Sequence, residues 1–104
     1  MIIAITSAGT LELNEPNDFK GFKIAVEKIG MTDAQIEVAL DGVATMDAAH
    51  DHAWVRQDAL RNWKGKPQPT EWIESFDKMI EKVKPYGWID EANGAVRGHI
   101  ERAG

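Results

Sequence analysis

The sequence predicts an α+β domain of the ferredoxin-like βαββαβ type, in which two helices cover one face of a four-stranded antiparallel sheet. Two observations lead to this prediction. Short apolar or alternating segments stand at the beginning, in the middle and at the end of the chain, as expected of strands. Between them lie two segments with apolar residues at helical spacing. The 104 residues have the length of one domain, so residues 1–104 are expected to fold as a single unit.

The first segments predict a strand and then a helix. Residues 1–6 are apolar and β-branched, and an extended chain would place Ile3 and Ile5 on one face. Residues 10–13 fit a short returning strand or an extended loop. A helix is expected to begin near Asn17 or Asp18 and to end at Gly30. Its apolar stripe would consist of Phe19, Phe22, Val26 and Ile29.

Residues 32–43 fit two different structures. Thr32 and Gln35 match a capping box, which favours a helix. Apolar residues at every second position favour a strand instead: Ile36, Val38 and Leu40. The strand, over residues 35–41, is the preferred interpretation.

The central segment, residues 47–63, also allows two interpretations. A single helix would have Arg56 on its apolar stripe and Val55 off it. A strand followed by a short helix fits better, with Asp58 as the cap of a helix over residues 59–63. The strand would carry Ala53 and Val55 on one face, and on the other His52, Trp54 and Arg56.

The last third of the chain predicts the clearest helix and a hairpin. The helix is expected from Pro69 or Thr70 to Val83, because one face is apolar: Trp72, Ile73, Phe76, Met79, Ile80 and Val83. After it, the pair Asn93-Gly94 is typical of a hairpin turn between residues 88–91 and 95–101.

Assembly of these elements predicts an apolar and a polar face of the sheet. The polar face would hold His52 and His99 on either side of the first strand, about 10 Å apart at their backbones. Small residues between them would leave room for a ligand. The order of elements resembles that of the dimeric α/β-barrel proteins, and a homodimer is expected because Ile2 and Trp54 would otherwise lie exposed on an open sheet.

Composition restricts the classes of function. The net charge of −5 and the pI near 5.1 argue against binding to nucleic acid or to an anionic membrane. The sequence has no cysteine, and no segment approaches the roughly 20 apolar residues of a membrane span. The first residues lack the basic region of a signal peptide, so a cytoplasmic location is expected.

The candidate site lies on the polar face. His52, His99 and Glu101 are the catalytic candidates, because a histidine can transfer protons near neutral pH and a carboxylate can orient it. The ligand-binding candidates are Trp54, Arg56, Arg97 and Thr6. His50 and His52 could share a metal ion on a strand, with Asp47 or Glu101 as a further ligand, but two surface histidines are the preferred interpretation, and neither a metal nor another cofactor is expected.

Two functional hypotheses follow. The first is a small enzyme or binding protein that holds a small organic ligand over the sheet and uses histidine for proton transfer. The alternative is a non-catalytic homo-oligomeric or protein-interaction domain, in which the same face is only an interface.

Overall fold

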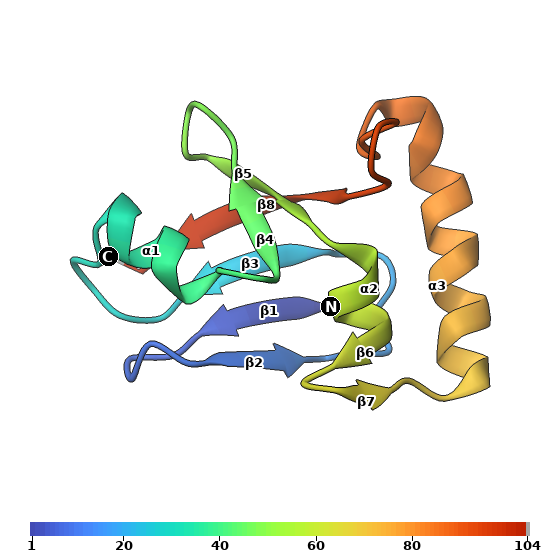
Figure 1. Ribbon diagram of the computed structural model, residues 1–104, viewed down its shortest axis with the longest axis horizontal. Helices are drawn as coiled ribbons and strands as arrows, with labels where there is room; N and C mark the ends of the chain where they lie inside the picture. Colours follow the sequence, from blue (N-terminus) through green and yellow to red (C-terminus); the bar gives the residue numbers. More distant parts are fainter. Residues whose placement is uncertain (104) are drawn as a thin grey trace.

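The computed structural model describes residues 1–103, which form a curled six-stranded mixed sheet and three α-helices (Figure 1). The strands of the sheet are β1 (Ile2–Ile5), β2 (Leu11–Asn14), β3 (Lys23–Val26), β4 (Ala44–Met46), β5 (His52–Val55) and β8 (Val96–Arg102). The helices are α1 (Asp33–Ala39), α2 (Gln57–Arg61) and α3 (Thr70–Val83), and α3 continues into the short 3-10 helix η1 (Lys84–Tyr86). A separate two-stranded hairpin consists of β6 (Asn62–Trp63) and β7 (Lys66–Pro67).

The strand order β2-β1-β3-β8-β5-β4 makes β8 the strand that joins two halves of the sheet. β8 pairs in parallel with β3, from Lys23↔His99 to Val26↔Arg102. On its other side it pairs antiparallel with β5, from His52↔His99 to Val55↔Val96. β1 and β3 are also parallel, so the carboxyl ends of β1, β3 and β8 meet at the end of the sheet where α1 lies, whereas α3 lies at the opposite end (Figure 1).

The hydrophobic core lies on one face of the sheet, and all three helices contribute to it. Alternation along the strands predicts this face correctly for β1, β5 and β8, whose inward residues are fully or almost fully buried: Ile3, Ile5, Ala53, Val55, Val96 and Ile100. The helices add Ile36 and Leu40 from α1 and the residue after it, Leu60 from α2, and Trp72, Phe76, Met79 and Ile80 from α3.

The prediction of a four-stranded antiparallel ferredoxin-like sheet is wrong, because two segments were assigned to the wrong type of element. The helix expected over residues 17–29 is absent, and this region contains the strand β3 instead. Ile24 and Val26 of that strand are buried between β1 and β8. The residues before β3 contact α3. The Trp72 indole Nε1 donates a hydrogen bond to the Pro16 carbonyl at 2.8 Å, and the Phe19 ring packs against Trp72. These tertiary contacts outweigh the helical spacing of the apolar residues.

The strand preferred for residues 35–41 is also wrong, since this segment is the helix α1. The capping box is present: the Gln35 N–H donates to Thr32 Oγ1 at 3.2 Å, and the Thr32 N–H donates to Gln35 Oε1 at 2.9 Å. Ile36 and Leu40, four residues apart, are buried on the same side, whereas Val38 is 76% exposed. The local capping signal therefore indicated the structure more reliably than the alternation did.

Of the other expected elements, the strands and helices are present, the helix after the central strand with shifted ends, whereas the hairpin of residues 88–91 and 95–101 is not formed. The central segment is a strand followed by a helix, although α2 begins at Gln57, and the Asp58 carboxylate binds Arg56. The predicted helix over residues 70–83 coincides with α3. Residues 10–13 do return as a strand, β2. The hairpin around Asn93-Gly94 is reduced to an isolated bridge between Ile89 and Val96. Within residues 1–103, no helix is long and apolar enough to cross a membrane.

Candidate functional site

The face of the sheet opposite the core carries the candidate site, and its centre is a pair of histidines. His52 on β5 and His99 on β8 are direct partners in the sheet register. Their ring centroids lie 5.3 Å apart in an edge-to-face arrangement. The expectation that they would stand on either side of the first strand is therefore wrong, because β5 and β8 pair directly and no strand lies between them. The two imidazoles are close enough to contact one ligand.

Arg97 extends this pair on the same face of β8. One of its guanidinium nitrogens, Nη2, lies 3.2 Å from His52 Nε2. Because a guanidinium can only donate hydrogen bonds, Nε2 must accept, and the proton of a neutral His52 ring is then on Nδ1. Nδ1 faces the Asp47 carboxylate, with Oδ2 at 3.6 Å. Asp47, His52 and Arg97 thus form a chain of polar contacts that orients the imidazole.

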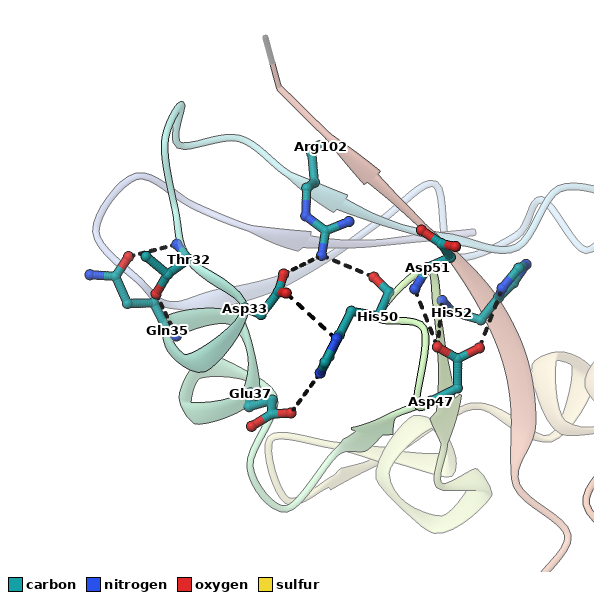
Figure 2. A network of polar contacts seen from close by, with 9 residues as sticks. All are labelled: Thr32, Asp33, Gln35, Glu37, Asp47, His50, Asp51, His52 and Arg102. Carbon is teal, nitrogen blue, oxygen red and sulfur yellow. Dashed lines mark hydrogen bonds and ion pairs between the residues drawn. The ribbon is translucent and has the colours of Figure 1, made fainter.

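Asp47 is itself held in the loop between β4 and β5. Its Oδ1 accepts hydrogen bonds from the backbone N–H groups of Asp51 at 3.2 Å and His52 at 3.4 Å (Figure 2). Desolvation raises the pKa of the Asp47 carboxyl, but these backbone bonds, with a smaller electrostatic contribution from the His52 side chain, outweigh it, so the pKa lies below its ordinary value. Asp47 therefore remains a carboxylate at neutral pH beside the His52 ring.

Arg97 differs from the other arginines in the described part of the chain. Arg56 is paired with Asp58 at 2.7 Å, Arg61 with Asp77 at 2.6 Å, and Arg102 with Asp33 at 2.6 Å. Arg97 is half-buried, yet no carboxylate of residues 1–103 lies within ion-pair distance of it. A partly desolvated cation without an internal counter-charge is an incomplete arrangement that an anion from solution would complete.

A small pocket of about 170 Å³ surrounds these groups. It is lined by Phe22, His52, Trp88, Arg97 and His99. The Arg97 backbone N–H donates to the Trp88 carbonyl at 2.8 Å. This bond holds the Trp88 backbone beside β8, the strand that carries Arg97. Phe22 rests on Gly98, where an added Cβ would stand only 3.1 Å from the Phe22 ring. The pocket is therefore lined by one guanidinium, two imidazoles and two aromatic rings.

Other predicted site residues lie outside this pocket. Glu101 binds Lys23 on the neighbouring strand at 2.8 Å, and this hydrogen bond, together with the lysine charge, lowers the pKa of the Glu101 carboxyl. Thr6 follows the end of β1 and its hydroxyl contacts that of Thr10 at 2.7 Å. Trp54 stands directly across from Arg97 in the register of β5 and β8, and together with Arg56 it lines a larger hollow of about 810 Å³. The structure thus brings together His52, His99 and Arg97 in the pocket and places Trp54 next to Arg97 in the sheet, whereas Glu101, Arg56 and Thr6 do not line the pocket.

His50 belongs to a separate network between the β4–β5 loop and α1 (Figure 2). Its Nδ1 lies 3.5 Å from Asp33 and its Nε2 lies 3.6 Å from Glu37, two carboxylates on one side of α1. Arg102 donates to both Asp33 and the His50 carbonyl. The His50 and His52 rings point away from each other in Figure 2, and residues 1–103 contain no group of three or more His, Cys, Asp or Glu side chains arranged to hold a metal ion.

Sequence reasoning missed three residues of the site: Asp47 as the partner of His52, and the walls Phe22 and Trp88. A signal existed for Asp47, since an aspartate at the start of a tight loop commonly accepts bonds from backbone N–H groups a few residues on. Phe22 depends on β3 lying next to β8, which no local pattern indicates, whereas the Asn93-Gly94 pair did place residues 88–91, and so Trp88, beside the last strand.

Comparisons of the chain with protein-family models, with curated proteins and with solved structures found no match.

Proposed function

We propose that this domain binds a small organic anion in the pocket formed by Phe22, His52, Trp88, Arg97 and His99. The observation that carries the proposal is Arg97, the half-buried guanidinium that has no carboxylate partner within residues 1–103. It stands in a pocket with two imidazoles, and of these three groups Arg97 and His99 can donate hydrogen bonds to an anion. The larger hollow beside Trp54 is a poorer candidate, because its arginines already bind carboxylates of this chain.

A carboxylate is the anion that fits these groups best. Guanidinium and carboxylate form planar two-point contacts, and Arg97 uses only one of its N–H groups on His52. The chain as a whole carries a net charge of −5, so long-range attraction of anions is weak and recognition depends on the local donors. The small volume restricts the buried part of the ligand to a few atoms.

His99 is the proposed group for proton transfer. His52 directs Nε2 toward Arg97 and Nδ1 toward Asp47, so neither nitrogen is free to exchange a proton with a ligand while these contacts hold. The His99 ring contacts His52 by its edge, is exposed, and forms no hydrogen bond with another described residue. It therefore offers a nitrogen to a ligand bound at Arg97.

Titration of acetate by two-dimensional NMR tests the binding proposal. Acetate is expected to shift signals of Arg97, His52 and His99, and Arg97→Gln should abolish these shifts. Arg56→Gln is the matched control, because it removes an arginine that is already paired with Asp58. Absence of acetate-induced shifts at the pocket, or shifts that persist unchanged in Arg97→Gln, would refute the proposal.

The competing hypothesis is a homo-oligomeric interaction domain. It predicts that the same face meets a second copy of the chain, so that signals of His99 and Arg97 change with protein concentration in the absence of any anion. Light scattering at micromolar concentration, with and without acetate, separates the two cases. A dimer that acetate leaves intact, with the pocket signals protected from acetate, would favour the interaction domain.

A further inference from the structure

We infer that the ligand of this pocket is an aromatic carboxylate, whose carboxylate binds Arg97 and whose ring lies against Trp88. This inference rests on the proposed function and adds the chemical class of the ligand. It follows from the position, exposure and attachment of two aromatic residues at the mouth of the pocket.

Two of the large apolar side chains that the described residues leave exposed are neighbours. Trp88 is 45% exposed and Tyr86 is 65% exposed, and their ring centroids lie 5.6 Å apart with an interplanar angle of 45°. Trp88 also lines the pocket beside Arg97. The aromatic surface is therefore continuous with the anion site. Exposed tryptophan beside polar groups is characteristic of binding surfaces, because the ring offers a large apolar area and loses little conformational freedom.

The backbone holds this aromatic pair in a defined place. Tyr86 ends the 3-10 helix η1, and Gly87 follows in the left-handed conformation with φ +75°, with its N–H bonded to the Lys84 carbonyl at 3.1 Å. Trp88 is then tied to β8 by the bond from the Arg97 N–H. This bond ties the Trp88 backbone to the strand that carries Arg97.

The size of the pocket makes the aromatic surface part of the site. Pockets that enclose whole ligands measure about 300–1,000 Å³. The volume here is about 170 Å³, which accommodates a carboxylate and a few neighbouring atoms. The rest of a ligand must lie outside the pocket, which Trp88 lines and beside which Tyr86 packs against Trp88. A planar apolar group bonded directly to the carboxylate matches this arrangement.

A ligand series on the intact chain tests the inference. Dissociation constants are measured by calorimetry for acetate, benzoate and benzyl alcohol, which combine or separate the anion and the ring. Benzoate is expected to bind about tenfold more tightly than acetate, from ring contacts of the usual strength. Benzyl alcohol, which has the ring without the charge, is expected to bind more weakly than benzoate by at least the same factor.

Two variants then assign the preference to a residue. In Trp88→Leu the ratio of the benzoate affinity to the acetate affinity should fall to near one. The ratio is the better readout, because a small change of the anion site alters both affinities alike. Trp63→Leu, which alters a tryptophan of the β6–β7 hairpin, should retain the wild-type ratio. The melting temperature of each variant shows that it is folded.

The outcomes for the inference and for the proposed function are distinguishable. Equal affinities of the wild type for acetate and benzoate would overturn the aromatic class while anion binding stands, as would a benzoate preference that Trp88→Leu retains. Failure of both acids to bind would overturn the proposed function and this inference with it. Benzyl alcohol binding as tightly as benzoate would show an apolar site without anion recognition and would overturn both.

Discussion

At the scale of single residues, Asp47 connects the fold to the site, because the carboxylate that accepts two backbone bonds of its loop also faces His52. Its pKa is lowered in the folded protein, so the folded state favours the ionised form. Such a group stabilises the fold above its unfolded pKa of about 3.9, and the stabilisation is lost as the pH falls through the folded pKa.

The first prediction concerns acid unfolding. The free energy of unfolding should fall as the pH is lowered below about 4, and Asp47→Asn should show a smaller fall than the wild type, because one of the carboxylates that must be protonated is gone. Urea denaturation at pH 7, 4 and 3 measures this. Asp51→Asn is the matched control: it removes the same charge from the same loop, but the Asp51 carboxylate accepts no hydrogen bond from another described residue. Equal pH dependence in Asp47→Asn and the wild type would contradict the prediction.

At the scale of secondary-structure elements, α1 shows how a local signal can decide a short helix. It has only seven residues, and isolated helices of this length are unstable in water. The reciprocal bonds of Thr32 and Gln35 and the burial of Ile36 hold it in place. α3 is the contrasting case, since its N-cap is Pro69 and no side chain caps it.

The second prediction follows from this contrast. Thr32→Ala should lower the free energy of unfolding by about 1 kcal/mol, since it removes a cap hydrogen bond that water replaces only in part. Thr70→Ala, at the start of the uncapped α3, should change it by no more than about 0.5 kcal/mol. Urea denaturation of the two variants makes the comparison. A loss in Thr70→Ala as large as that in Thr32→Ala would show that the capping box contributes nothing specific.

The elements that the sequence predicts well are those whose signals agree at every level. β1, β5, β8 and α3 each combine a suitable composition with a consistent apolar face, and most of the residues on that face are buried. β3 was missed because it has only four residues and its apolar neighbours occur at helical spacing. Without β3 beside β8, the sequence-based prediction could not place Phe22 in the pocket.

The candidate site was predictable only where it depends on alternation within β5 and β8. His52, Arg97 and His99 share a face because side chains alternate along a strand, and this much follows from the sequence. Their direct pairing depends on the order of strands in the sheet. Glu101 forms its ion pair with Lys23 of β3, a strand that the sequence does not predict.

At the scale of the whole molecule, β8 determines whether the two halves of the sheet form one body. Its inward residues Val96 and Ile100 are 2% and 3% exposed, and they belong to the same core as residues from β1, β3 and β5. Its outward residue His99 is exposed. Adjacent positions on this strand therefore have opposite importance for stability.

The third prediction uses that difference. Ile100→Ala should lower the free energy of unfolding by about 2–5 kcal/mol, because it leaves a cavity at the junction of the two halves. His99→Gln should change the stability by no more than about 0.5 kcal/mol, since its ring lies on the open face. Chemical denaturation of both variants checks this. A stable Ile100→Ala together with an unstable His99→Gln would mean that the strand faces the opposite way.

The position of β8 in the chain has a kinetic consequence. β1, β2 and β3 come from the first 26 residues, and β4 and β5 from residues 44–55, so each half can begin to form early. β8 follows all of them, and its parallel pairing with β3 joins residues 76 positions apart, from Lys23 to His99. During synthesis on a ribosome, the half made of β1, β2 and β3 and the half made of β4 and β5 would remain unjoined, with exposed apolar faces, until β8 emerged. Closing so long a loop costs conformational entropy before the contacts between β3 and β8 have formed, and this step is therefore slow. Folding should be limited by the docking of β8.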